Sequence, residues 1–333
     1  MKLTGMNKVH LITGITGQDG VFLTSKILQE NPNDTIIGIS RNFNEKVFFQ
    51  KLKYTNSFNN NFENINIFNI NLLSKESVNN FIKDIKPNFI YNLSGPSSVY
   101  KSLIDNDQTY EEIINIFDNI FNSLTTLNLE CNFFQASSSE MFAPSAKKLT
   151  ETSDFLPRSP YAKAKLIVHN KIQSFKNLEN INISSGIMFN HESEFRDNEY
   201  LIMKIINFAI NTSKGENSKL NLGSTEILRD WSYAGDVAEA IYRINNKNKS
   251  QDYVVGSGTG YKIQNILENV FGYFDLNWED YVLVDPTLLR KGDPISIVSD
   301  PRKINQEHNW KTKVSLESLL EKCIQFKLNN LNQ

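Results

Sequence analysis

The chain has 333 residues, of which 35 are Lys or Arg and 37 are Asp or Glu, so its formal net charge is −2. This balance argues against nucleic acid as the main partner, because domains that bind nucleic acid usually carry a basic excess. Hydrophobic residues make up 40% and charged residues 22% of the chain, which is enough to bury a core and unlike a disordered or fibrous protein. The length predicts one large or two ordinary domains.

Three further features concern the compartment. We find no apolar run of the roughly 18 residues that a membrane span needs, and residues 1–5 do not resemble the start of a signal peptide. Cys131 and Cys323 are the only cysteines, too few for a disulfide framework or a four-thiolate metal site. We therefore expect a soluble, cytoplasmic protein with no metal and no membrane partner.

Short apolar runs alternate with amphipathic segments through the first half of the chain. The patterns predict strands at residues 8–13, 35–40, 65–69, 88–93, 132–137 and 181–189. They predict helices at residues 21–29, 74–85, 111–129 and 161–175. This alternation is typical of βαβ units, so we expect an α/β fold with a Rossmann-type, doubly wound parallel sheet.

The regular alternation stops after residue 190. The clearest elements beyond it are a helix at residues 200–211 and a final helix near residues 316–326. We predict a dinucleotide-binding domain over residues 1–189 and a smaller α/β substrate domain over residues 190–333. Some segments, about 229–250, are expected to return to the first domain.

A glycine-rich turn separates the first predicted strand from the first predicted helix. Gly14, Gly17 and Gly20 have the spacing Gly-x-x-Gly-x-x-Gly. Such glycines allow a tight turn, close approach of a pyrophosphate and close packing of the helix, and the helix N-terminus attracts the phosphates. A turn without a ligand could have the same spacing, but the strand–turn–helix context favours a dinucleotide.

The residue after the second strand bears on the choice of cofactor. An NAD site usually has a carboxylate there for the ribose 2′-hydroxyl, whereas this chain has Arg41. A cation suits a 2′-phosphate, so we predict NADP. The alternative is that Arg41 is only an exposed cation.

A possible catalytic group follows the fifth strand. Tyr161 and Lys165 are four residues apart and share one helix face, where an ammonium favours the phenolate and makes Tyr161 a candidate proton shuttle. Ser138 and Glu140 lie at the carboxyl end of the fifth strand, which in a doubly wound sheet lines the ligand crevice. The alternative is a chance surface pair of Tyr and Lys.

Together these motifs resemble the GDP-mannose 4,6-dehydratase family of the extended short-chain dehydrogenases/reductases. The resemblance covers nearly all of the chain, and its most specific pieces are Phe-Asn-His-Glu-Ser and Arg-Asp-Trp. The matching stretches are residues 11–20, 136–142, 157–165, 189–193 and 229–231.

The resemblance implies a reaction at C4, C5 and C6 of a GDP-linked sugar. Tyr161 would take the C4 hydroxyl proton while a hydride passes to the nicotinamide, and Ser138, where the family has Thr, would hydrogen-bond the C4 oxygen. Glu140 would remove the C5 hydrogen and protonate the leaving C6 hydroxyl, and the same hydride would return to C6. The product would be a 4-keto-6-deoxy sugar, expected to feed deoxysugar synthesis for a surface polysaccharide.

Two other functions stay open. A 4-epimerase or 4-reductase on the same scaffold would need no base such as Glu140 at this place. A non-catalytic dinucleotide sensor would lack the Tyr and Lys pair, which this chain keeps.

The resemblance also implies binding residues and an assembly. The cofactor residues would be Gly14, Thr16, Gly17, Gln18, Asp19, Gly20, Arg41, Asn71, Leu72, Leu93, Ser94, Tyr161 and Lys165. The residues that bind the sugar nucleotide would be Ser97, Asn190, Lys204, Arg229, Arg290 and Asp293. Relatives form homodimers or homotetramers.

The chain departs from the family pattern near the cofactor and the expected sugar pocket. The departures are Asn42, Asn71, Gly95-Pro96, Ser98 and Met203. They leave the reaction type in place but leave the sugar open, so GDP-mannose or a relative such as GDP-manno-heptose is expected.

Overall fold

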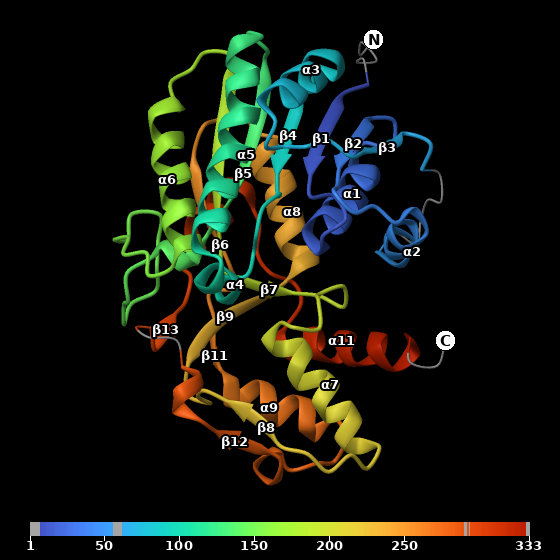
Figure 1. Ribbon diagram of the computed structural model, residues 1–333, viewed down its shortest axis with the longest axis vertical. Coiled ribbons are helices and arrows are strands. Elements are labelled where there is room, and N and C mark those ends of the chain that lie inside the picture. The colour runs from blue at the N-terminus through green and yellow to red at the C-terminus, as the bar shows by residue number, and fades with distance from the viewer. Residues whose placement is uncertain (1–6, 56–61, 290–291, 293, 331–333) are drawn as a thin grey trace. The chain divides into compact units, whose positions relative to one another are not determined.

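The computed structural model describes residues 7–55, 62–289, 292 and 294–330 (Figure 1). The described residues form two compact units. The first comprises Met1–Met141, Phe155–Ile187 and Ala238–Tyr253, and the second comprises Phe142–Asp154, Met188–Val237 and Val254–Gln333.

These boundaries differ from the predicted domains in two places. Residues 142–154 belong to the second unit, where Leu149 forms an isolated β-bridge, accepting a backbone hydrogen bond from Asp300 N and donating one to Val298 O. The returning segment is Ala238–Tyr253, and Asn245 within it donates a side-chain hydrogen bond to Ile90 O of the central sheet.

The first unit is built on a sheet that has seven strands among the described residues. Their order is β10-β6-β5-β4-β1-β2-β3, and the pairs β1–β2, β1–β4, β2–β3 and β4–β5 are parallel. The strands are β1 (Val9–Thr13), β2 (Thr35–Ile39), β3 (Ile65–Phe68), β4 (Phe89–Asn92), β5 (Cys131–Ser138), β6 (Ile181–Met188) and β10 (Asp252–Val255). This confirms the doubly wound sheet, whose order reverses between β1 and β4.

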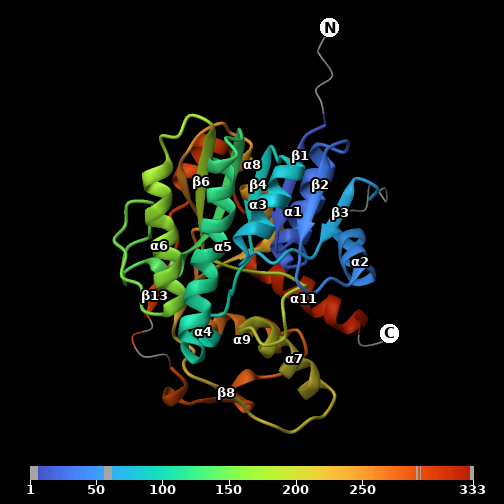
Figure 2. The same cartoon turned by 45° about the horizontal axis from the view of Figure 1, so that its top comes forward.

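Helices cover both faces of this sheet (Figures 1 and 2). One face packs against α3 (Lys75–Ile85), α5 (Asn106–Thr126) and α6 (Pro160–Phe175) through a core of buried apolar side chains. The helices α1 (Gln18–Glu30) and α8 (Ala234–Asn245) contact each other, since Asn31 at the end of α1 donates to Tyr242 of α8 at 2.6 Å. The remaining helices are α2 (Glu45–Thr55), which packs on α1, and α4 (Val99–Ile104).

The second unit has its own core. Its strands are β7 (Asn190–Glu192), β8 (Leu220–Leu222), β9 (Leu228–Tyr233), β11 (Gly260–Lys262), β12 (Val282–Val284) and β13 (Ser296–Ile297). Its helices are α7 (Leu201–Ser213), α9 (Ile263–Gly272), α10 (Arg302–His308) and α11 (Leu316–Asn330). Strand β9 pairs with β7, β11 and β13, and aliphatic side chains of α7, α9 and α11 fill the core. This unit is the smaller α/β part that the sequence predicts.

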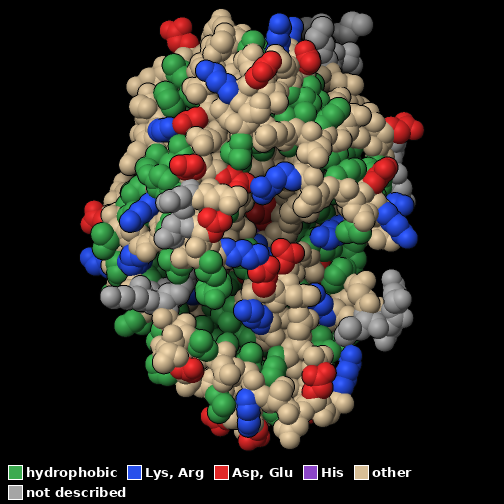
Figure 3. All heavy atoms as spheres, in the orientation of Figure 1, with side chains coloured by type: hydrophobic (Ala, Val, Ile, Leu, Met, Phe, Trp, Pro, Cys, Tyr) green, Lys and Arg blue, Asp and Glu red, His purple; other side chains and the backbone are tan. Residues whose placement is uncertain are grey.

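None of the helices within the described ranges is long and apolar enough to cross a bilayer. Basic and acidic side chains are interspersed on the face shown in Figure 3.

Candidate active site

The glycine-rich turn joins β1 to α1 in a conformation that needs glycine. Gly14 has a φ of 72°, and a Cβ atom there would lie 3.1 Å from Leu93 O. Gly17 is the N-cap residue of α1, and having no side chain it leaves the first N–H groups of the helix without a cap from that position. A tight glycine turn, beside a helix N-terminus that Gly17 leaves without a side-chain cap, fits the pyrophosphate of a dinucleotide.

The third glycine brings the helix close to the turn. A Cβ atom on Gly20 would lie 2.4 Å from Ile15 O, so only glycine fits without a shift of the backbone. On the other side of the turn, Thr16 Oγ1 and Ser40 Oγ are 2.8 Å apart, which ties the turn to the end of β2.

An open pocket lies at the ends of β2 and β3. It is lined by Arg41, Asn42, Phe43, Asn44 and Asn69. The Arg41 side chain is 72% exposed, and its Nη1 lies 2.9 Å from Glu112 Oε1 on α5. The sequence reasoning named Arg41 but missed Asn69, although Asn69 follows the end of β3 as Arg41 follows the end of β2.

Two predicted cofactor residues after β3 have different surroundings. Asn71 is exposed, and its Oδ1 accepts a hydrogen bond from Leu73 N at 3.1 Å. Leu72 is buried in the apolar core, and its carbonyl accepts from Asn119 Nδ2 at 2.9 Å. The side chain of Leu72 therefore serves packing.

The end of β4 lies beside the glycine turn. Thr13 Oγ1 accepts hydrogen bonds from the backbone N–H groups of Leu93 and Ser94, each at 3.2 Å. The structure thus brings Gly14, Leu93 and Ser94 together. Ser97 lies three residues further on and is exposed.

The predicted catalytic serine and glutamate share one short turn. Ser138 is the last residue of β5 and is 7% exposed, and Glu140 is in the 3-10 turn η1 (Ser139–Met141) that follows. Ser138 Oγ accepts a hydrogen bond from Glu140 N at 3.2 Å.

Helix α6 positions the tyrosine and the lysine. It begins because Ser159 caps it, accepting from Ala162 N at 3.1 Å, and Pro160 fills the first turn. Tyr161 and Lys165 are both buried, and Lys165 Nζ lies 5.6 Å from the centroid of the Tyr161 ring.

Lys165 also contacts the strand that carries the serine. Its Nζ donates a hydrogen bond to Ala136 O of β5 at 2.9 Å. Burial lowers the pKa of Lys165 to about 8. The four predicted catalytic residues thus lie on the end of one strand, the turn after it and one helix of the first unit.

The predicted substrate residues of the second unit lie on separate elements. Asn190 begins β7 opposite Trp231, and Lys204 is exposed on α7. Arg229 on β9 is buried, and its Nη1 donates to Leu228 O at 3.0 Å and to Pro294 O at 2.8 Å. Arg290 and Asp293 lie outside the described residues.

The sheet order, the glycine turn and the tyrosine–lysine pair on one helix define a Rossmann-fold protein of the short-chain dehydrogenase/reductase class. A UDP-glucose 4-epimerase from Thermotoga maritima has the same fold, with a TM-score of 0.82, 18% identity and coverage of 97% of this chain and 99% of that chain. A dTDP-glucose 4,6-dehydratase from Streptomyces venezuelae, solved with NAD bound, has a TM-score of 0.83 and 16% identity, covering 97% and 98% of the two chains.

The sequence profile described as GDP-mannose 4,6 dehydratase matches residues 11–323. GDP-mannose 4,6 dehydratase 2 of Arabidopsis thaliana is 32% identical over 324 residues, which cover 95% of this chain and 86% of that protein. The human GDP-mannose 4,6 dehydratase is 27% identical over 338 residues, covering 95% and 90%. The chain belongs to the GDP-mannose 4,6-dehydratase family.

Proposed function

We propose that this protein is a cytoplasmic GDP-sugar 4,6-dehydratase that acts on GDP-mannose or a GDP-linked relative such as GDP-manno-heptose. Family membership supports the GDP-linked substrate. The observation that carries the reaction type is the place of Glu140, a carboxylate in the turn after β5, where Ser138 ends the strand and Ala136 holds Lys165. A 4-epimerase or 4-reductase would have no use for a base there.

The oxidation step depends on the tyrosine. A bound nicotinamide cofactor would accept a hydride from C4 of the sugar and return it to C6. Tyr161 would remove the C4 hydroxyl proton, because the ammonium of Lys165 beside its ring stabilises the phenolate. Ser138 would hydrogen-bond the C4 oxygen.

The elimination step depends on Glu140. A ketone at C4 acidifies the hydrogen on C5, and Glu140 would remove that proton and deliver one to the departing C6 hydroxyl, so that water leaves. The hydrogen bond from Glu140 N to Ser138 Oγ keeps both residues in one turn, which suits groups that act on neighbouring carbons.

The proposal also assigns the residues that would bind the cofactor and the substrate. Arg41, exposed over the pocket at the end of β2, favours NADP through the 2′-phosphate. Asn190, Lys204, Arg229, Arg290 and Asp293 would bind the sugar nucleotide with Ser97. The active form would be a homodimer or homotetramer.

The mass of the product tests the reaction. The protein is incubated with GDP-mannose and, in parallel, with GDP-manno-heptose, and a dehydrated product is lighter by about 18 mass units, the mass of one water. We expect this loss with at least one substrate and no net consumption of reduced cofactor. A product of unchanged mass, or one formed only as NADPH is consumed, would favour the epimerase or reductase.

A matched pair of variants tests the base. Glu140→Gln is expected to abolish water loss and to leave the cofactor dissociation constant unchanged. Glu179→Gln, an exposed glutamate in the loop before β6, serves as the control and should keep full activity. Normal water loss in Glu140→Gln would exclude the role assigned to Glu140.

A further inference from the structure

A buried chain of side-chain hydrogen bonds crosses the carboxyl ends of three neighbouring strands. Thr13 Oγ1 of β1 donates to Asn92 Oδ1 of β4 at 2.8 Å, and Asn92 Nδ2 donates to Gln135 Oε1 of β5 at 2.8 Å. The exposed fractions of the three residues are 0%, 1% and 3%. Each bond lies in a water-poor interior, where hydrogen bonds polarise one another.

This series of hydrogen bonds ends at the carbonyl oxygen of Ala136, which also binds the Lys165 ammonium. Gln135 Nε2 donates to Ala136 O at 2.9 Å, and Lys165 Nζ donates to the same oxygen at 2.9 Å. Strand β4 ends at Asn92, whose register partner is Gln135, so Ala136 lies one residue beyond the pairing with β4. This carbonyl has two lone pairs, and two side-chain donors share them.

We infer that Gln135 is a positioning residue for Lys165, held in place by Asn92 and Thr13. The inference rests on the catalytic role proposed for Lys165. A lysine has a flexible four-carbon stem, so the place of its ammonium depends on the group that anchors it. Gln135 occupies one lone pair of the anchoring carbonyl and leaves the other direction to Lys165.

The opposite end of this series of hydrogen bonds reaches the glycine-rich turn. Thr13 precedes Gly14, and its Oγ1 accepts from the N–H groups of Leu93 and Ser94. A continuous series of short bonds therefore runs from the turn predicted to bind the pyrophosphate to the ammonium predicted to act beside the nicotinamide. Apolar residues at 92 and 135 would need no such partners, because burying an amide is favourable only when its hydrogen bonds are made.

A second buried amide on the same strand provides a matched control. Asn132 is 7% exposed, accepts from Asn182 Nδ2 at 2.9 Å and donates to Asn245 O at 2.8 Å. It lies near the other end of β5 and makes the same kinds of bonds. Asn132→Leu therefore measures the effect of losing a buried amide on the fold alone. Gln135→Met removes a buried amide as well, and any additional effect it has is attributed to Lys165.

The first measurement follows Lys165 in the cofactor-free protein. Lysine is labelled with ¹³C at Cε, and the Lys165 signal is assigned by its absence in Lys165→Met. We expect Gln135→Met to raise the titration midpoint of Lys165 by at least about 0.5 pH unit, because the carbonyl loses a competing donor and accepts more strongly from the ammonium. Asn132→Leu should leave this midpoint unchanged.

The second measurement is a double-mutant cycle on the dissociation constant of NADPH. Gln135→Met should weaken binding by about fivefold in the wild-type background and by less than about twofold in the Lys165→Met background, because its effect acts through the lysine. Gln135→Leu, which is close to glutamine in volume and carries no charge, replaces Gln135→Met if that variant does not fold, and it should also raise the Lys165 midpoint.

Three outcomes overturn the inference: an unchanged Lys165 midpoint in the Gln135 variants, an equal shift in Asn132→Leu, or the same loss of NADPH affinity with and without Lys165. If the wild-type protein binds neither NADPH nor NADH, the proposed function fails, and the titration of Lys165 alone decides the inference.

Discussion

Arg41 Nη1 lies 2.9 Å from Glu112 Oε1, so an arginine at the end of β2 pairs with a glutamate of α5. The arginine side chain is 72% exposed, whereas the glutamate side chain is 9% exposed. The buried carboxylate therefore fixes an exposed cation over the pocket at the ends of β2 and β3. A guanidinium has five N–H donors, which leaves donors for a phosphate.

Arg41→Ala should separate the two nicotinamide cofactors. We expect the affinity for NADPH to fall by about tenfold or more, because a charge-assisted hydrogen bond contributes about 1.5–3 kcal/mol. The affinity for NADH should change by less than about twofold. Titration calorimetry with both cofactors measures this, and Lys53→Ala, at an exposed lysine of α2, is the control. Equal losses for NADPH and NADH would contradict a 2′-phosphate contact.

Lys165→Met should stabilise the fold at neutral pH. Burial lowers the pKa of Lys165 from 10.5 to about 8, so the unfolded chain holds this proton more tightly than the folded protein. The free energy of unfolding therefore rises with pH between about 8 and 10.5, and below that window the folded state carries the full cost of the buried charge. The variant should gain up to about 3 kcal/mol near pH 7, at 1.36 kcal/mol per pKa unit.

Urea unfolding across this pH range measures the effect. The gain should shrink from about pH 8 upward and vanish above pH 10.5, while turnover falls by about 10²- to 10⁴-fold. Lys163→Met, at an exposed lysine on the same helix, should change neither quantity. A loss of stability in Lys165→Met near pH 7 would show that the hydrogen bond to Ala136 outweighs the cost of burial.

Substitution by alanine should have opposite effects on stability at two helical glycines. A Cβ at Gly20 would lie 2.4 Å from Ile15 O, so Gly20→Ala must push α1 off the turn, at a cost of roughly 1–3 kcal/mol. The structure places nothing it describes within 4 Å of a Cβ at Gly272, so Gly272→Ala should be neutral or stabilise by up to about 1 kcal/mol through helix propensity. Thermal unfolding compares them, and equal effects would argue against close packing at Gly20.

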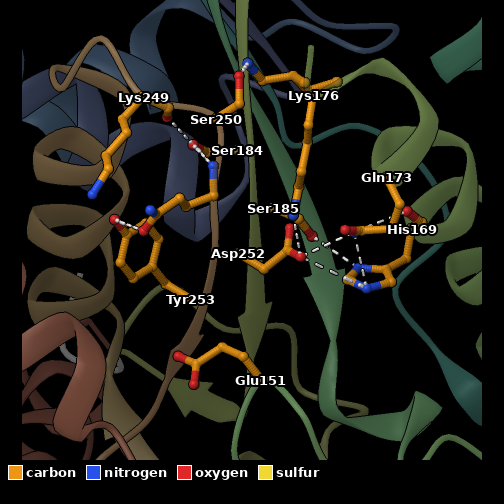
Figure 4. A network of polar contacts seen from close by, with 12 residues as sticks. Glu151, His169, Gln173, Lys176, Ser184, Ser185, Lys249, Ser250, Asp252 and Tyr253 are labelled. Carbon is orange, nitrogen blue, oxygen red and sulfur yellow. Dashed lines mark hydrogen bonds and ion pairs between the residues drawn. The ribbon is translucent and has the colours of Figure 1, made fainter.

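A polar network between α6 and β10 should make stability sensitive to acid (Figure 4). His169 is buried; its Nε2 lies 3.2 Å from Gln173 Nε2 and 4.0 Å from Asp252 Oδ2, and Asp252 pairs with Lys176 at 2.6 Å. Burial lowers the pKa of His169, an effect that Asp252 opposes and Lys176 reinforces. Because the unfolded chain binds the proton more readily, stability falls as the pH drops below about 6.5.

His169→Gln should reduce the loss of stability at acid pH. The wild-type melting temperature is expected to fall between about pH 7.5 and about pH 5.5, and the variant should show a smaller fall. Part of the fall in melting temperature should remain in the variant, because burial also lowers the pKa of His10. An equal fall in both proteins would mean that His169 does not titrate in this range.

The strands β1 to β6 and the start of α6 could be predicted because their signals are local, whereas the edge strand β10 was not predicted. Apolar runs of strand length, Ser159 as a cap and Pro160 in the first turn act within a few residues of each other. The strands β7 and β11 could not be found, because an element of three residues cannot show alternation. The helix α8 was missed although Val237, Ala238 and Ile241 have helical spacing.

In the candidate site, too, the local signals could be predicted from the sequence and the contacts between distant residues could not. Tyr161 and Lys165 could be proposed together because both belong to one helix, and Gly14 because it belongs to one turn. The hydrogen bonds from Asn92 to Gln135 depend on the register of β4 against β5, which a single sequence does not contain. The contact of Arg41 with Glu112 depends on where α5 crosses the end of β2, and their separation of 71 positions gives no signal.

Each of the two cysteines lies in the interior of a different unit. Cys131 begins β5 and Cys323 lies on α11, and burial raises the pKa of both thiols. An alkylating reagent reacts with the thiolate and needs access to it, so each sulfur becomes reactive only when its own surroundings open. The natural protein thus already contains one internal reporter for each half, and the rates at which the two positions are modified in urea tell which half loosens first.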